Sequence, residues 1–355
     1  MASRTARQRT GQRAVTTDIA PVVPGRRGEL RTSTLRAAAR EALGKQAFVL
    51  LLFYIALFVA FAVVSPEFMS ASNLVNVAST SGILMMVTAG QALTIIAGGF
   101  DLSVGGVVPL GAVVFALLSN MLPLVPLIIV VLLIGVAIGL VNAGLVSVVG
   151  VNPLIATLGM LSVTGGVALT LANGLTIAVP SGIGVLGSSG PGGVPYFMYV
   201  VIVIIAAVAC ALRWTGIGRR IYVVGGNPEA ARLAGIRVGA VTAVAYASSA
   251  LLAAFAGILY ASQLLEATGT VGSNSTLISV AAAVLGGVAL TGGEGGIGGV
   301  VLGVLVLGTV QDGLSVLRVP GFYETIVTGV ILLVAMSFGR LRRMGRLRST
   351  ATSST

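Results

Sequence analysis

The sequence predicts an all-α fold, a polytopic membrane protein with about ten transmembrane helices, some of them short or broken by glycine-rich turns. Hydrophobic residues make up 56% of the 355 residues and charged residues only 9%, whereas soluble proteins carry about 25% charged residues. Apart from Arg318, arginine is confined to both ends and one central loop, which is typical of cytoplasmic segments beside a membrane. The net charge of +11 therefore indicates membrane topology and not binding to nucleic acid.

The first 46 residues are predicted to be a disordered, basic cytoplasmic tail. They are rich in Arg, Thr, Ala and Gly, with Pro21 and Pro24. Such a composition cannot bury enough apolar surface to fold alone. The first apolar run, Ala47–Val64, is long enough to span a membrane and is expected to be retained as a helix.

The membrane domain is predicted to cover residues 47–338. Its apolar runs, in chain order, are Ala47–Val64, Leu74–Ala97, Gly106–Leu118, Leu124–Val146, Pro153–Leu171, Tyr196–Leu212, Ala240–Ser262, Ile278–Leu290, Ile297–Val310 and Tyr323–Phe338. The third, eighth and ninth runs are short and end in glycine-rich stretches, which leaves their boundaries open.

Charge gives the chain an orientation. An even number of runs precedes the loop of residues 213–238, and an even number separates it from the arginine-rich tail of residues 339–355. An N-terminus inside the cell therefore places this loop and the C-terminus inside as well. Four acids then fall on the outer side: Glu67, Glu266, Asp312 and Glu324.

The central loop is the longest polar interruption and contains a predicted short helix. Asn227 suits the N-cap, Pro228 suits the first helical position, and Glu229 faces the positive end of the helix dipole. Gly235 can end the helix after about two turns. A short, capped helix in a basic loop suits docking onto a soluble partner, but an ordinary cytoplasmic loop would have the same pattern.

Several classes of chemistry are excluded. The chain has no histidine and a single cysteine, Cys210, so we expect no metal site, no cofactor and no catalytic residue. It also lacks the GxxxxGK[ST] loop that binds ATP. Any ATP-driven work must come from another subunit.

Two glycine-rich turns resemble one another, because each places an acid in a break between apolar runs. The first holds Asp101 and Ser103 and the second holds Glu294. Broken backbone and acids at membrane depth commonly line a cavity, which would put these residues on a translocation path. Alternatively, Asp101 caps the following helix from the inner membrane surface. The alternation of spans gives both turns the same sidedness.

Polar residues within the spans are further candidates for the translocation path. They are Gln91, Asn152, Thr157 and Ser162. Asn152 and Pro153 also form a helix-start signal for the fifth span. Such hydroxyl groups more often bond to carbonyl groups of their own helix than face a passage.

Three stretches resemble the permease subunit of bacterial ABC importers for simple sugars, of the ribose, xylose, arabinose and galactose type. Ala97–Gly105, AGGFDLSVG, is similar to the family's GGIDLSVG. Asn152–Gly159, NPLIATLG, is similar to PFIATLG. Gly218–Ile236, GRRIYVVGGNPEAARLAGI, is close to GR.IYAIGGN..AARLAGI and is the most specific of the three.

The resemblance implies a partner set and a location. A permease of this kind forms a homodimer in the bacterial cytoplasmic membrane, surrounded by lipid, and is itself not an enzyme. It binds a cytoplasmic ABC ATPase with two nucleotide-binding modules and receives a neutral monosaccharide from an extracytoplasmic binding protein. The residues implied in ATPase docking and coupling are Gly225, Gly226, Asn227, Glu229, Ala230, Ala231, Arg232, Gly235 and Ile236.

Two alternatives stay open at this point. A branched-chain amino-acid ABC permease would have a similar docking loop. A stand-alone secondary transporter or channel would need ion-coupling acids within the spans, for which Asp101 and Glu294 are the only candidates.

Overall fold

The computed structural model describes residues 47–320 together with residues 323, 326, 327, 329, 330 and 333. The predicted tail of residues 1–46, nearly all of the predicted span Tyr323–Phe338 and the predicted tail of residues 339–355 lie outside the described residues.

Helices form almost all of the described structure, as predicted. Seven are long and apolar enough to cross a membrane within the described part of the chain. They are Ala47–Val64, α2 (Ala71–Ile96), α4 (Leu124–Gly144) with the π-helical turn η2 (Leu145–Val149), α5 (Pro153–Ala172), α6 (Tyr196–Trp214), α9 (Val238–Leu264) and α11 (Ile297–Val316). Two apolar helices are shorter, α3 (Val104–Leu118) and α10 (Ser275–Leu285).

The remaining elements are small. They are the 3-10 helices η1 (Pro66–Met69), η3 (Gly184–Gly187) and η4 (Pro191–Gly193), the helices α7 (Gly216–Gly226) and α8 (Pro228–Leu233), and the strands β1 (Ile177–Ala178) and β2 (Glu266–Ala267). The two strands pair antiparallel, with Ile177 opposite Ala267.

The predicted count of about ten transmembrane helices is not confirmed. α3 has 15 residues and α10 has 11, which at 1.5 Å per residue gives roughly 22 Å and 16 Å against a hydrocarbon core of about 30 Å. α10 ends at Leu285 and not at Leu290, because Gly287 adopts a left-handed φ of 90°. α11, predicted to be short, continues to Val316.

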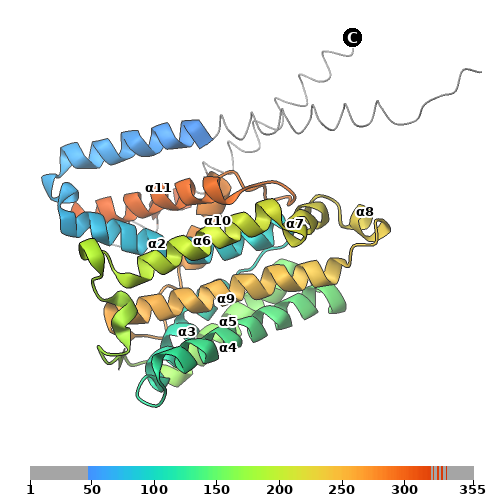
Figure 1. Ribbon diagram of the computed structural model, residues 1–355, viewed down its shortest axis with the longest axis horizontal. Helices are drawn as coiled ribbons and strands as arrows, with labels where there is room; N and C mark the ends of the chain where they lie inside the picture. The colour runs from blue at the N-terminus through green and yellow to red at the C-terminus, as the bar shows by residue number, and fades with distance from the viewer. Residues whose placement is uncertain (1–46, 321–322, 324–325, 328, 331–332, 334–355) are drawn as a thin grey trace, which may run out of the picture. The chain divides into compact units, whose positions relative to one another are not determined.

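α9 is the central helix of the described bundle. It packs against α2, α3 and α4, and Figure 1 shows it running between the group α2, α6, α10 and α11 and the group α3, α4 and α5. Gly90 in α2, Gly111 in α3 and Gly139 in α4 each lie directly against the backbone of α9. Small residues at these crossings allow the close approach that stabilises helix pairs within a membrane.

Other helices are largely exposed. Only 6% of the apolar window in Ala47–Val64 and 22% in α5 is buried, compared with 89% in α2. The exposed faces of Ala47–Val64 and α5 are apolar, so within a membrane they must meet lipid or another protein chain.

The two ends of the bundle carry different chemistry. At one end, Asp312 in α11 accepts hydrogen bonds from Asn73 Nδ2 (2.8 Å) and Asn76 Nδ2 (2.9 Å) at the start of α2. At the other end, where α2 finishes and α11 begins, lie α7 and α8 (Figure 1). The alternation of spans predicted this separation of Asp312 from the arginine-rich loop.

Candidate functional site

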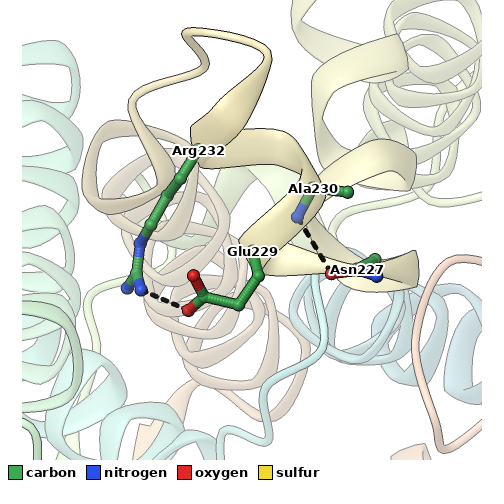
Figure 2. A network of polar contacts seen from close by, with 4 residues as sticks. All are labelled: Asn227, Glu229, Ala230 and Arg232. Atoms are coloured by element: carbon green, nitrogen blue, oxygen red, sulfur yellow. Dashed lines mark hydrogen bonds and ion pairs between the residues drawn. The ribbon is translucent and has the colours of Figure 1, made fainter.

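The central loop folds into two helices, and the second one begins where the sequence predicted. Asn227 is the N-cap of α8, and its Oδ1 accepts a hydrogen bond from the Ala230 backbone N–H (3.0 Å; Figure 2). Pro228 occupies the first turn, where no N–H is needed. Gly235 then takes a left-handed φ of 77°, and the Ile236 N–H bonds to the Ala231 carbonyl (2.9 Å), which ends the helix.

α8 is held from one side and exposed on the other. It packs against α7 and α9, and Ala231 is fully buried at that contact. Glu229 and Arg232 form an exposed ion pair of 2.6 Å one turn apart (Figure 2). Such an exposed pair stabilises a helix only slightly, so its two side chains are free to exchange partners on a second protein.

Most of the residues predicted to dock are exposed, either on α8 or directly beside it. Gly226, Asn227, Glu229, Ala230, Arg232 and Gly235 are exposed, Ile236 is half-buried, and Ala231 and Gly225 are buried. The sequence-based site missed Leu233, whose side chain is 91% exposed. A signal was available in the sequence, since Leu233 is the one large apolar residue among residues 226–235.

The two glycine-rich turns lie side by side and next to α7. The Gly293 N–H in the second turn donates a hydrogen bond to the Ile96 carbonyl, which immediately precedes the first turn (2.9 Å). Gly98 and Gly292 are in backbone contact. The same sidedness predicted for these turns is therefore confirmed, and Glu294 is exposed at this end of the bundle.

Tyr222 of α7 joins the second turn. Its phenol donates a hydrogen bond to the Gly295 carbonyl (2.9 Å). Burial raises the pKa of Tyr222 above its ordinary value, because an apolar environment disfavours the phenolate. The hydroxyl group therefore stays protonated as a donor at physiological pH.

Asp101 belongs to a buried polar network at the start of α3. Its Oδ1 accepts hydrogen bonds from the backbone N–H of Ser103 (3.1 Å) and from Ser103 Oγ (2.5 Å). Asn142 Nδ2 of α4 donates to Ser103 Oγ (2.9 Å). The sequence-based site did not include Asn142, although an amide within an otherwise apolar span was a visible signal.

Several polar atoms of this region have no partner within the described residues. They are Asp101 Oδ2, Asn142 Oδ1, Ser249 Oγ of α9, and both side-chain amide atoms of Gln91 in α2. All four side chains are fully buried. Asp101, Ser103 and Gln91 are therefore enclosed within the described part of the chain.

α5 presents the other candidates. Asn152 caps this helix by accepting a hydrogen bond from the Leu154 N–H (2.9 Å). Thr157 is buried and bonds to the Pro153 carbonyl (2.8 Å), whereas Ser162 is exposed and bonds to the Leu158 carbonyl (3.3 Å). Both hydroxyl groups thus bond back to their own helix.

The exposed surface of α5 is mostly apolar, with Ile155 and Val163 among its most exposed side chains, but one stripe of it carries small residues. Nothing lies within 4 Å of a side chain added at Gly159 or Gly166, and Ser162 stands between them on the same face. The structure does not bring this face together with Asp101 or Glu294.

Comparison with known proteins identifies relatives along most of the chain. The family described as "Branched-chain amino acid transport system / permease component" matches residues 73–336. The ribose import permease protein RbsC of Haemophilus influenzae is 33% identical over 292 residues, which cover 80% of this chain and 90% of that protein.

Two further relatives cover similar lengths. A probable ABC transporter permease protein of Sinorhizobium fredii is 34% identical over 283 residues, covering 79% of this chain and 85% of the relative. The galactose/methyl galactoside import permease protein MglC of Escherichia coli is 32% identical over 330 residues, covering 85% of this chain and 98% of the relative. No solved structure matches the chain.

Proposed function

Because this chain belongs to the family described as the branched-chain amino acid transport system / permease component, we propose that it is the membrane-spanning subunit of an ATP-driven importer for a neutral monosaccharide. The sugar assignment is supported by the relatives named for ribose and for galactose and methyl galactoside. The scarcity of charged side chains in the spans also suits an uncharged substrate better than an ion.

The observation that carries the ATP-driven part of the proposal is α8. It is a capped helix held by α7 and α9, and its exposed surface offers an apolar Leu233 beside Glu229 and Arg232. A central apolar anchor with charged neighbours is the pattern of a protein-docking surface. Since the chain has no ATP-binding loop of its own, we assign this surface to a cytoplasmic ABC ATPase with two nucleotide-binding modules.

The arginines support the proposed orientation. Arg213, Arg219, Arg220 and Arg237 surround α7 and α8, and positively charged loops stay in the cytoplasm. With α3 and α10 counted as crossings despite their shortness, both termini are then cytoplasmic and the membrane is the bacterial cytoplasmic membrane. The opposite end, where Asp312 ties α11 to α2, faces an extracytoplasmic binding protein that delivers the sugar.

The exposed face of α5 is the proposed wall of the translocation path. Ser162 and the open glycines on either side of it would face a second copy of the chain, and hydroxyl groups with small neighbours give weak, multi-site contact with a polyol. Of the buried candidates, only Thr157 lies on α5, where it would support this wall from within. Asn152, the N-cap of α5, would lie at one end of this wall.

The proposed mechanism involves no covalent chemistry in this chain. ATP binding closes the two ATPase modules, and the docked α8 helices move with them. The bundle then exchanges between two arrangements that open the path to opposite sides, which is a ligand-biased two-state change.

Reconstituted transport tests the proposal. The chain is incorporated into proteoliposomes with its cognate ATPase and binding protein, and uptake of radiolabelled pentoses, hexoses and leucine is measured with and without ATP. We expect accumulation of at least one sugar, dependent on both ATP and the ATPase. Accumulation of leucine alone would establish the amino-acid alternative, and accumulation without the ATPase would establish a stand-alone transporter.

A further inference from the structure

Three pairs of glycines from distant parts of the chain meet at one place, here called the glycine junction. They are Gly98–Gly99 in the first turn, Gly225–Gly226 at the end of α7, and Gly292–Gly293 in the second turn. A Cβ atom on Gly225 would overlap the Ile96 carbonyl oxygen and lie 2.8 Å from the Gly293 nitrogen. A Cβ atom on Gly292 would lie 2.6 Å from the Gly225 carbonyl oxygen. The three backbones therefore touch with no side chain between them.

This contact is directional as well as close. The Gly293 N–H bonds to the Ile96 carbonyl (2.9 Å), and Tyr222 bonds to the Gly295 carbonyl (2.9 Å). Gly98, Gly292 and Gly293 have φ values of 86°, 79° and 73°, a region that other residues rarely occupy. Backbone contacts and hydrogen bonds of this kind leave little room for α7 and the turns to move independently. A displacement of α7 must therefore move both turns.

α8 is connected to the glycine junction through both helices that hold it. Asn227, the cap of α8, directly follows Gly226. On the other side, Tyr246 of α9 donates a hydrogen bond to the Phe100 carbonyl (3.0 Å), and its hydroxyl group packs against Gly99. The two helices that hold α8, α7 and α9, therefore both contact the first turn as well.

The two glycine-rich turns are directly connected to the two short helices, α3 and α10. The first turn leads directly into α3, and the second joins α10 to α11. α3 and α10 begin beside each other, where Thr276 Oγ1 of α10 donates to the Leu102 carbonyl (3.2 Å). Short helices joined by irregular backbone are the parts of a membrane bundle that can shift without unfolding a full span.

We propose that the glycine junction, with Tyr222, is the positioning element that transmits movement of α8 to both glycine-rich turns and so to α3 and α10. This inference rests on the proposed function and explains how the docking site on α8 is coupled to the helices of the bundle. Gly225, Gly293 and Tyr222 act by holding backbones in register and have no contact with ATP or sugar.

The test measures sugar molecules transported per ATP hydrolysed in the reconstituted complex. In Gly225→Ala the new methyl group must displace the Ile96 carbonyl, and we expect the ratio to fall at least tenfold. Gly298→Ala is the matched control: Gly298 lies close after the second turn, in α11, but nothing is within 4 Å of an added Cβ atom. We expect that control to keep the wild-type ratio.

A second variant adds no bulk and so avoids misfolding. Tyr222→Phe removes only the hydrogen bond to Gly295, and we expect a fall of about threefold in the ratio with an unchanged melting temperature. Its control is Tyr199→Phe, which removes an equivalent bond to the Pro191 carbonyl (2.8 Å) at the far end of the bundle and should have no effect.

The outcomes separate this inference from the proposed function. Wild-type ratios in both Gly225→Ala and Tyr222→Phe would overturn the glycine junction as a transmitter, as would equal losses in the two controls. A lower melting temperature with an unchanged transport ratio would show that the glycine junction stabilises the fold but does not transmit movement. Absence of ATP-driven uptake by the wild-type complex would instead overturn the proposed function, and this inference with it.

Discussion

Asp101 combines hydrogen bonds to Ser103, the first residue before α3, with an unusual lack of charge compensation. One carboxylate oxygen bonds to the Ser103 backbone and hydroxyl groups, while the other has no partner among the described residues. No ion pair to Asp101 occurs in the described part of the chain. A buried carboxylate without a cation is costly, whereas a neutral amide in the same position could donate to the unpartnered oxygen atoms nearby.

We therefore predict that Asp101→Asn keeps sugar uptake within about twofold of wild type. The amide oxygen would still accept from the Ser103 N–H, so the start of α3 would be preserved. Asp101→Ala, which removes the hydrogen bonds to Ser103, should lower stability by about 1–3 kcal/mol. Proteoliposome uptake and thermal unfolding in detergent measure the two effects.

The opposite result would be informative. A loss of uptake beyond tenfold in Asp101→Asn, with an unchanged melting temperature, would show that the charge itself takes part in transport. Asp101 would then return to the translocation path, as the first of the two sequence-based interpretations had it.

At the scale of elements, α8 is stabilised on one face only, which makes its other face a probe of partner binding. Leu233 is 91% exposed, so replacing it costs almost no packing within this chain. Burying a leucine at an interface contributes about 1.5–3 kcal/mol. We predict that Leu233→Asp leaves the melting temperature of the permease unchanged but weakens ATPase binding at least tenfold.

Co-purification of the ATPase over a concentration series measures this effect. Met121→Asp, at a 75% exposed position in the loop between α3 and α4, is the control and should bind the ATPase as wild type does. Equal binding by the Leu233 variant would remove α8 as the docking surface.

Local sequence signals predicted where helices begin better than which distant residues contact one another. Asn-Pro pairs correctly marked the starts of α5 and α8, since an N-cap and a proline act on the backbone beside them. The true end of α10 depends on a left-handed Gly287, which an apolar pattern extending to Leu290 obscures. The bond between Asn142 and Ser103 joins residues 39 positions apart, and no local pattern specifies such a contact.

At the scale of the whole described bundle, Asp312 and the arginine-rich loop lie at opposite ends as predicted, but burial did not follow from hydropathy. α2 and α5 are both apolar, yet 89% of the window in α2 is buried and only 22% in α5. The difference arises from glycines that bring α2 onto α9, whereas the glycines of α5 at positions 159 and 166 face open space. The polar candidates Gln91 on α2 and Ser162 on α5 consequently differ in exposure: Gln91 is enclosed, and Ser162 is accessible.

That difference yields a prediction about the path. Ser162→Trp places a large ring where the described chain leaves open space, so the variant should fold and unfold as wild type does. If the exposed face of α5 borders the path, the ring should obstruct it, and uptake should fall at least tenfold with ATPase binding unaffected.

The control is Ile202→Trp, which adds a similar ring at a 62% exposed position of α6. Both variants enlarge an exposed side chain within a span, so a general effect of tryptophan in the bilayer would appear in both. Full uptake by the Ser162 variant would exclude this face of α5 from the path. A loss confined to the Ser162 variant would place the sugar beside α5, because only there does added volume meet the substrate and not lipid.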